Sequence, residues 1–260
     1  MSRLTLDQDQ CLQDGACVDV CPARTLRMNE AEYPEEIAEA HCIECGHCVA
    51  VCMSGALHHA ALPDETFLPM PENWPSAETM DGFLMSRRSV REFKPEPVAR
   101  PTMEALLEVA RRAPTASNSQ KLRWIVVSGR DKVQALAAAV VEGGRLGGLP
   151  ASLLAQWEAG YDFVLRGAPT VLAGCAPREY SWGQIDCATA LAYVELAAEA
   201  RNLGACWAGY LTHIGSLYPP VQELLQIPAG YTLCGGLMLG EGTYAYLRIP
   251  PRKPLAVQWL

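Results

Sequence analysis

The chain contains no apolar run long enough to span a membrane, since a transmembrane helix needs about 20 consecutive, mostly apolar residues. It also lacks a tract of clustered Lys and Arg: 21 basic residues stand against 29 acidic ones, which gives a formal net charge of −8. Nucleic-acid binding depends on clustered positive charge, so we expect no nucleic-acid partner. The first ten residues, MSRLTLDQDQ, have neither the apolar core of a signal peptide nor a twin arginine. We therefore expect a cytoplasmic protein with no membrane partner.

A Gly-x-Gly-x-x-Gly fingerprint after a strand is also missing, so the sequence gives no sign of a Rossmann dinucleotide site. The glycines at positions 143, 144, 147 and 148 follow a predicted helix instead, and we interpret them as a loop. The chain of 260 residues is 50% hydrophobic and 19% charged, a composition typical of globular proteins. It can therefore bury a sizeable core in one or two domains.

Cysteine, in contrast, is abundant: the chain has 11, and most of them lie in two runs with the same spacing. The first run reads Cys-x2-Asp-x2-Cys-x3-Cys-Pro from residue 11, and the second reads Cys-x2-Cys-x2-Cys-x3-Cys from residue 42. Both runs keep one register, so that residue 11 corresponds to residue 42 and residue 21 to residue 52. This is the spacing of bacterial ferredoxins, in which three cysteines bind one cluster and the fourth binds the other. The segment therefore predicts an electron-transfer module with two iron–sulfur clusters.

Crossed ligation divides the cysteine runs into two ligand sets. One cluster is expected on Cys42, Cys45, Cys48 and the remote Cys21, and the other on Cys11, Asp14, Cys17 and the remote Cys52. Asp14 stands where a fourth thiolate is usual, and a carboxylate is a harder ligand that binds this iron less firmly. Three outcomes stay open: a four-iron cluster with an Asp ligand, a four-iron cluster with a water ligand, or a three-iron cluster.

Zinc is the alternative metal for such a segment, but zinc sites use four ligands, typically as two pairs, and crossed triplets fit that arrangement poorly. His41 and His47 flank the second run. We interpret them as solvent-facing neighbours that tune the cluster, not as ligands. The remaining cysteines, at positions 175, 187, 206 and 234, lie in apolar stretches and are expected to be buried, free thiols.

The composition predicts two domains. Residues 1–62 carry the cysteine repeat and are too few for an ordinary core, so that clusters would act as staples. Residues 63–75 contain prolines among acidic residues and predict a semi-extended linker. Residues 76–260 mix predicted helices with β-rich runs, which predicts an α/β or α+β fold. The helices are expected at 102–113, 131–142 and 186–204 (the last capped by Gly204), and the strands at 124–129, 170–174 and 232–240.

Three stretches of the second domain carry side chains suited to a flat ligand with a phosphate group. SRRSVREF (86–93) is rich in arginine, and APTASNSQ (113–120) is a loop of small residues in which Asn118 and Gln120 can hydrogen-bond a polar ring. RIPPRKPLAVQW (248–259) brings further cations back on an expected, proline-stiffened strand. Phosphate recognition favours arginine side chains and hydroxyls that converge from separate segments.

Together with LGACWAG (203–209), these stretches resemble the nitroreductase family of FMN-dependent oxidoreductases, although Lys121-Leu122 stands where Pro-Trp is usual. The whole chain resembles a ferredoxin–nitroreductase fusion. The resemblance implies an α+β fold with a central, antiparallel-rich sheet, dimer-forming helices, and a homodimer that binds two FMN molecules at its interface. The cofactor-binding residues that it implies are Arg87, Arg88, Ser89, Arg91, Pro114, Thr115, Ala116, Asn118, Ala208, Gly209 and Arg252.

The resemblance also implies roles for these residues. Arg87, Ser89 and Arg252 would hold the FMN phosphate, and Arg91 would lie near the pyrimidine side of the flavin. The loop at 114–118 would reach in from the partner subunit, and backbone amides around Ala208 and Gly209 would meet flavin N5. No catalytic side chain is named, because in this family the flavin carries the chemistry while the protein binds and orients it.

We therefore expect an enzyme that takes electrons through its own clusters, collects them in pairs on FMN and reduces a small, electron-poor acceptor. A nitroaromatic, a quinone or an activated alkene would qualify. The electron donor stays open between an external ferredoxin and NAD(P)H. A redox relay or sensor that passes electrons to a partner protein is the alternative, and flavin-modifying or dehalogenating chemistry is a third. The segment 143–166 is expected either to cover the flavin or to pack at the dimer interface.

Overall fold

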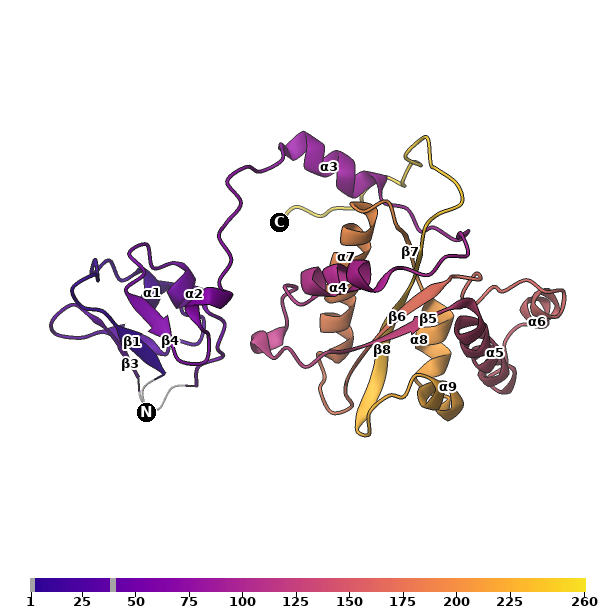
Figure 1. The fold of residues 1–260 in the computed structure, drawn as a ribbon, viewed down its shortest axis with the longest axis horizontal. Coiled ribbons are helices and arrows are strands. Elements are labelled where there is room, and N and C mark those ends of the chain that lie inside the picture. The colour runs from indigo at the N-terminus through magenta and orange to yellow at the C-terminus, as the bar shows by residue number, and fades with distance from the viewer. Residues whose placement is uncertain (1–2, 38–40) are drawn as a thin grey trace. The chain divides into compact units, whose positions relative to one another are not determined.

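A computed structural model describes residues 3–37 and 41–260 (Figure 1). The chain forms two compact units: Met1–Trp74 with Ser117–Ser119, and Pro75–Ala116 with Gln120–Leu260. Within residues 63–75, the predicted linker, a single 3-10 turn, η1 (Asp64–Thr66), follows Pro63. In the described ranges, no helix is both long and apolar enough to cross a membrane.

The two cysteine runs of the first unit adopt the same local structure. Helices α1 (Ala16–Asp19) and α2 (His47–Ala50) each follow a glycine at the same position of the repeat, Gly15 and Gly46. Both glycines adopt left-handed φ angles, 70° and 74°, which favour glycine because other residues carry a Cβ that clashes there. The sequence repeat therefore fixes two equivalent turns.

Two small antiparallel sheets complete this unit. Strand β1 (Leu4–Leu6) pairs with β4 (Leu57–His59), and β2 (Leu26–Met28) pairs with β3 (Pro34–Glu36). The apolar core is small and centres on Cys17, Leu26 and Leu57. Such a core gives little stability of its own, and domains of this size usually need metals or disulfides in addition.

The second unit is built on one antiparallel sheet. Its strands are β5 (Arg123–Ser128), β6 (Thr170–Pro177), β7 (Gly204–Trp207) and β8 (Tyr231–Gly240), in the order β5-β6-β8-β7. All three pairings are antiparallel. The predicted α+β class with a central antiparallel sheet is therefore confirmed.

Helices cover both faces of this sheet. The helices of this unit are α3 (Ala77–Ser86), α4 (Arg100–Ala110), α5 (Arg130–Leu146), α6 (Ala151–Glu158), α7 (Gly183–Glu199), α8 (Gly209–Gly215) and α9 (Pro219–Leu224). Of these, α4 and α7 lie on one face of the sheet, and α5 and α8 lie on the other. Successive residues of β6 point to opposite sides: Leu172 joins the core under α4 and α7, and Val171 joins the core under α5 and α8. Figure 1 shows these two pairs of helices on either side of the sheet. This two-sided burial explains why β6 is almost uniformly apolar.

Two glycine predictions are wrong. Gly143 and Gly144 do not form a loop but lie within α5, where a Cβ would come 2.7 Å from the Tyr218 ring and 2.1 Å from Leu149 respectively. Gly204 does not cap α7, which ends at Glu199; it opens β7, where a Cβ would lie 2.7 Å from Val90. These glycines permit close packing, which a one-dimensional pattern does not reveal.

The expected strand near the C-terminus is also wrong. Residues 248–260 form no regular secondary structure and are exposed. Three prolines in this stretch lack the N–H that a strand needs to donate to a neighbour. Arg252 is accordingly exposed in this structure, away from regular structure.

Candidate functional site

One predicted ligand set surrounds a cavity in the first unit. Cys42, Cys45, Cys48 and the remote Cys21 all line it. Three of these cysteines come from the loop before α2 and from α2 itself, and Cys21 follows α1. Crossed ligation assigns the same four residues to one cluster.

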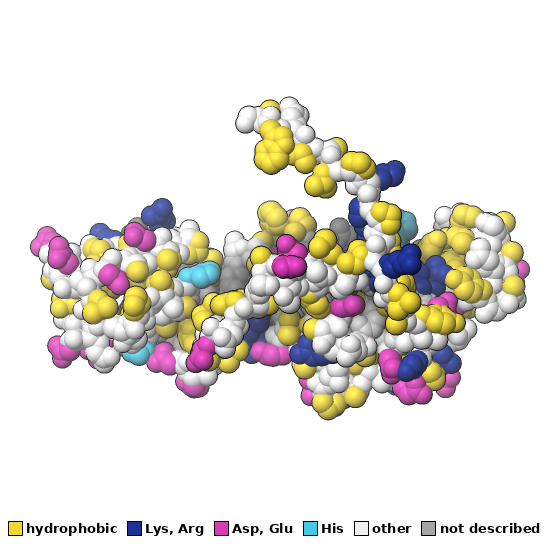
Figure 2. Space-filling model, turned by 90° about the horizontal axis from the view of Figure 1, so that it is seen from above, with side chains coloured by type: hydrophobic (Ala, Val, Ile, Leu, Met, Phe, Trp, Pro, Cys, Tyr) yellow, Lys and Arg dark blue, Asp and Glu magenta, His cyan; other side chains and the backbone are white. Residues whose placement is uncertain are grey.

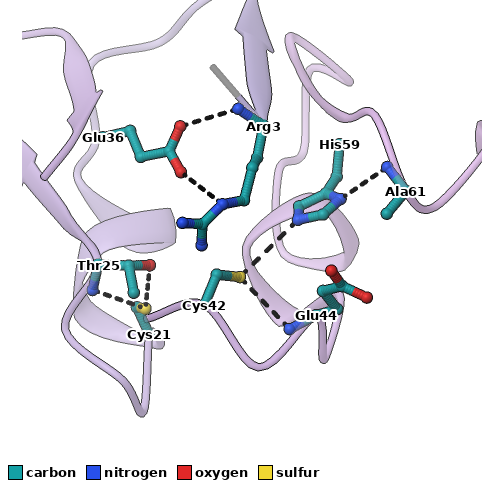
Figure 3. Close-up of polar contacts among 8 residues, drawn as sticks. All are labelled: Arg3, Cys21, Thr25, Glu36, Cys42, Glu44, His59 and Ala61. Carbon is teal, nitrogen blue, oxygen red and sulfur yellow. Dashed lines mark hydrogen bonds and ion pairs between the residues drawn. The ribbon is translucent and has the colours of Figure 1, made fainter. Parts of the chain in front are cut away.

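Hydrogen-bond donors surround the sulfur atoms of this set (Figure 3). The backbone N–H and the hydroxyl of Thr25 approach Cys21 Sγ at 3.3 and 3.2 Å. The Glu44 N–H donates to Cys42 Sγ at 3.3 Å, and His59 Nε2 lies 3.8 Å from the same sulfur. His47 Nδ1 lies 3.1 Å from Cys45 Sγ. N–H and O–H donors of this kind stabilise negative charge on sulfur.

The thiols of this set differ in how readily they lose a proton. Burial raises the pKa of Cys48 to about 11, and neighbouring Cys42 and Cys45 add to that rise. At Cys21 burial also acts to raise the pKa, but the hydrogen bonds from Thr25 and from nearby backbone groups outweigh it and the pKa is lowered. Metal binding needs thiolates, so iron would have to displace a proton at Cys48.

The second predicted set surrounds a separate cavity. Cys11, Asp14, Cys17 and Cys52 line it together. One oxygen of Asp14 accepts a hydrogen bond from the Ala16 N–H at 3.1 Å, which holds the carboxylate at the start of α1. Burial raises the pKa of the Cys17 thiol. At Cys52 burial acts in the same direction, but hydrogen bonds from Ser54 and the backbone outweigh it and lower the pKa.

These donor sets fit clusters better than single ions. In the described part of the chain, no group of three or more His, Cys, Asp or Glu side chains converges on one metal position. An iron–sulfur cluster binds each thiolate through a different iron, so its ligands surround a volume instead of meeting at a point. Two cavities, each lined by one crossed set, have that arrangement.

A cavity of about 380 Å³ lies in the second unit at the end of β7. Two predicted cofactor residues, Arg91 and Gly209, line this cavity. Its other lining residues come largely from other segments of the second unit. These are Phe163, Val164, Arg166, Cys206, Trp207, Tyr210, His213 and Met238. Its volume falls within the ~300–1,000 Å³ range of small-molecule sites. The cavity can therefore accommodate part of a flat cofactor or an acceptor.

A second, more polar cavity of about 290 Å³ shares Arg91 and Arg166 with the first and adds Arg130. Asp162 also lines it, but its carboxylate already accepts hydrogen bonds from the N–H groups of three residues, Val164, Leu165 and Gly167. Burial raises the pKa of the Cys206 thiol, which lines the first of these cavities, and the positive charges of Arg91 and Arg166 oppose that rise. Three arginines, Arg91, Arg130 and Arg166, thus line the polar cavity together with the carboxylates of Asp162 and Glu92.

The other arginines of the 86–93 segment are engaged within the protein. Arg87 Nη1 donates to the buried carboxylate of Glu195 at 2.7 Å. Arg88 donates to the carbonyl oxygens of Met85 and Ser86. Ser89 lies beside Ala205 of β7 through an isolated parallel bridge, which aligns this segment with the edge of the sheet.

The loop at 113–120 does not line either cavity of the second unit. Pro114 is exposed, and Thr115 Oγ1 accepts a hydrogen bond from the Gln120 N–H at 3.1 Å. The Ala116 N–H donates to the buried Asp186 carboxylate at 3.1 Å. Asn118 belongs to the first compact unit, where its side-chain amide donates to the carbonyls of Ile43 and Glu44 at 3.0 and 2.9 Å.

The backbone N–H groups of the two residues expected to meet flavin N5 differ in their hydrogen bonding. The Ala208 N–H donates to Gly236 O at 2.9 Å and is therefore already used within the sheet. The Gly209 N–H opens α8, where a backbone donor has no acceptor within its own helix. Gly209 is thus the better donor of the pair.

Several residues of these sites were not expected from the sequence. His59, Thr25 and Glu195 approach predicted residues from other segments. Arg166, which ends the segment 143–166 that was expected to cover the flavin or to pack at the dimer interface, lines both cavities of the second unit. His59 had a signal in the alternation of β4, which predicts that Leu57 and His59 share the buried face. The others lack a comparable local pattern.

Two family models match the chain. Residues 84–241, more than half of its length, match the nitroreductase family, and residues 3–53 match a 4Fe-4S dicluster domain. A 4-nitrobenzoate reductase from Nocardioides sp. is 29% identical over 208 residues, covering 64% of this chain and 81% of that protein. A protein named ferredoxin 7Fe, from Hydrogenibacillus schlegelii, is 39% identical over 64 residues, covering 25% of this chain and 70% of that protein.

A solved structure supports the fold of the second unit. A nitroreductase with bound FMN from Desulfitobacterium hafniense superposes with a TM-score of 0.58 at 25% sequence identity. The likeness covers 71% of this chain and 100% of that one.

Proposed function

Because the chain belongs to the nitroreductase family and is therefore an oxidoreductase, we propose that it binds FMN and reduces a small, electron-poor acceptor with electrons supplied through its own iron–sulfur clusters. One observation carries this proposal: two ferredoxin-type ligand sets, each around its own cavity, occur in the same chain as a nitroreductase-family unit. FMN, when bound, accepts electrons singly and delivers them in pairs, which joins one-electron clusters to two-electron chemistry.

The four-cysteine set would hold a four-iron cluster through Cys21, Cys42, Cys45 and Cys48. For the set that contains Asp14 we infer a three-iron cluster, with Cys11, Cys17 and Cys52 as the thiolate ligands. The relative named ferredoxin 7Fe supports this choice, since one four-iron and one three-iron cluster together contain seven irons. The weaker affinity of a carboxylate for iron agrees with it.

The cavity at the end of β7 would hold part of the flavin. Arg91 supplies a fixed positive charge there, and Gly209 supplies a backbone donor without a bulky side chain. The FMN bound to the solved relative supports this assignment. Arg87, Arg88, Ser89 and Arg252, together with the loop at 114–118, remain predicted cofactor contacts.

We propose a homodimer in which each subunit completes the flavin site of the other. Figure 2 shows apolar side chains exposed on the face that it draws. Three of the most exposed apolar residues lie near the C-terminal end of the sequence. Leu247, Leu255 and Trp259 are 93%, 91% and 90% exposed. Apolar segments of this kind usually mark an interaction site.

The acceptor is proposed to carry a negatively charged group beside its electron-poor ring. Arg91 and Arg166 line both neighbouring cavities, so a ring in one and a carboxylate in the other would meet the same guanidinium groups. The 4-nitrobenzoate reductase relative acts on a compound of that kind.

The proposal is tested by anaerobic purification with iron, sulfide, zinc and flavin quantitation, followed by stopped-flow reduction. Reduced ferredoxin should reduce the bound flavin quickly in the wild-type protein and slowly in Cys45→Ser, which removes one cluster ligand. Cys175→Ala, which changes a buried thiol of β6 outside both ligand sets, should behave like the wild type. Rapid flavin reduction by NAD(P)H with inert clusters would contradict the electron route, and zinc or missing FMN would contradict the function. Flavin reduction without turnover of any small acceptor would favour a redox relay instead.

A further inference from the structure

His59 is a buried histidine beside one predicted cluster ligand. It ends β4, and the alternation of the strand turns Leu57 and His59 inward while His58 faces outward. His59 is 5% exposed, whereas the His58 ring contacts Asp64 Oδ2 at 2.7 Å in a half-exposed pair. The strand thus offers two adjacent histidines in opposite environments.

The hydrogen bonds of the His59 ring identify which nitrogen carries the proton. Nδ1 accepts a hydrogen bond from the Ala61 N–H at 3.1 Å, so this nitrogen presents a lone pair. The neutral ring then has its proton on Nε2. Nε2 lies 3.8 Å from Cys42 Sγ, within the longer range of hydrogen bonds to sulfur, and Figure 3 shows the ring between the two partners. His59 is therefore oriented by the backbone to donate toward the thiolate.

The pseudo-repeat shows that the three side-chain donors of the four-cysteine set have no counterparts at the equivalent positions of the other half. Three side chains approach sulfurs of the four-cysteine set: Thr25 at Cys21, His47 at Cys45 and His59 at Cys42. Their equivalents in the other half of the repeat are Ala56, Ala16 and Met28, none of which has a polar hydrogen on its side chain. At the other set the side-chain contact to sulfur is Ser54 Oγ, 3.7 Å from Cys52 Sγ.

Donors to the sulfur ligands stabilise the reduced cluster more than the oxidised one, because the reduced cluster carries more negative charge. The effect is larger where water is excluded, since the local dielectric constant is lower there. His47 and its neighbour Cys45 are more open to solvent, whereas His59 is buried. His59 should therefore have the larger effect of the two histidines.

We propose that His59 is a positioning residue that sets the reduction potential of the four-cysteine cluster through an Nε2–H hydrogen bond to the Cys42 sulfur. It raises that potential above the value that the cysteine ligands alone would give, and it leaves the cluster at Asp14 unaffected. This inference rests on the proposed presence of the clusters but not on the identity of the acceptor or on FMN.

The test is an EPR-monitored potentiometric titration of the full-length protein with its clusters. His59→Phe keeps a flat ring and removes the donor, so the equilibrium constant for reducing the four-cysteine cluster should fall about tenfold, which is ~59 mV for a one-electron couple. His59→Gln, which retains one donor and one acceptor, should restore most of the wild-type potential. His58→Gln should leave it unchanged, and the midpoint of the second cluster should stay constant in all three variants.

A His59→Phe protein with a wild-type midpoint would overturn the proposal, and so would an equal shift of both clusters. If the His59→Phe variant loses its cluster, the contact between His59 and the Cys42 sulfur can be measured in a protein that keeps His59. Pulsed EPR of reduced protein carrying His47→Gln and ¹⁵N-labelled histidine should show a nitrogen coupling to the four-cysteine cluster, and the absence of that coupling would overturn the proposal. A wild-type protein without reducible clusters would contradict the proposed function as well, which separates the two failures.

Discussion

Arg87 and Glu195 form an ion pair that joins the end of α3 to the C-terminal part of α7. The guanidinium donates to the carboxylate at 2.7 Å, and Glu195 is only 7% exposed. Burial raises the pKa of Glu195, and the positive charge of Arg87 opposes that rise. One carboxylate contact leaves other N–H groups of the guanidinium available. Arg87 can therefore both neutralise Glu195 and meet the phosphate that we expect it to bind.

We expect Arg87→Gln to destabilise the protein and to weaken FMN binding. Removing one partner of a fully buried pair costs about 3–5 kcal/mol, and the partial exposure of Arg87 reduces this to roughly 1–3 kcal/mol. Without Arg87 the pKa of Glu195 in the folded protein rises further. At pH values between the pKa of Glu195 in the unfolded chain and its pKa in the folded protein, the native state therefore binds more protons than the unfolded state. Stability of the variant should then fall as pH increases from 5 to 8, more steeply than in the wild type. Calorimetry at both pH values measures this difference.

Arg100→Gln is the matched control, because Arg100 forms an exposed ion pair with Glu104 on the surface of α4. This change should leave both stability and FMN affinity essentially unchanged, because solvent screens an exposed pair. An Arg87→Gln protein with wild-type stability at both pH values would contradict the coupling of these residues.

Asp14→Cys completes the four-thiolate pattern of the second cluster and should add one iron per chain. A thiolate at this position binds the fourth iron more firmly than a carboxylate does. Iron and sulfide quantitation after anaerobic purification measures the gain, and EPR of the oxidised protein should lose the signal of a three-iron cluster. Asp14→Asn, which is similar in size but uncharged, should leave the iron content as it is. Equal iron in Asp14→Cys and the wild type would mean that the native cluster already holds four irons.

The sequence grouped the residues that line each of the two cavities of the first unit because their spacing is a local property of two turns. The repeat requires left-handed glycines at positions 15 and 46, and these turns bring each triplet around its cavity. His59 and Thr25 reach the sulfurs only through the fold, so no spacing rule identified them. Fewer of the predicted cofactor contacts come together, since the family resemblance draws them from distant segments and from a partner subunit. Of these, Arg91 and Gly209 line the cavity at the end of β7.

The helical glycines of α5 provide a test of packing in the second unit. Alanine normally stabilises a helix by about 1 kcal/mol relative to glycine. At Gly144, however, the new Cβ would lie 2.1 Å from Leu149, and at Gly143 it would lie 2.7 Å from the Tyr218 ring. Overpacking of this kind costs about 1–3 kcal/mol, so both substitutions should lower the free energy of unfolding.

Gly82→Ala is the matched control within α3, where a Cβ would meet no atom within 4 Å. We expect it to raise stability by about 0.5–1 kcal/mol. Urea denaturation of the three variants measures the contrast. Stabilisation by all three would show that the contacts of α5 relax without cost and that these glycines are not required for close packing.

Arg166 should decide how well the enzyme accepts anionic substrates. Its side chain lines both cavities of the second unit and donates a hydrogen bond to the hydroxyl of Tyr161. A charge-assisted hydrogen bond contributes about 1.5–3 kcal/mol, so Arg166→Gln should raise KM for 4-nitrobenzoate roughly tenfold or more. The KM of the Arg166→Gln variant for neutral nitrobenzene should change less than about twofold, because nitrobenzene has no carboxylate to contact Arg166.

The matched control is Lys132→Gln, which removes an equal charge from an exposed position of α5 that does not line either cavity. It should leave both KM values unchanged. Steady-state kinetics with the two acceptors distinguishes a specific contact from a general loss of positive charge. Equal effects of Arg166→Gln on both acceptors would assign Arg166 to the flavin or the fold instead of the substrate anion.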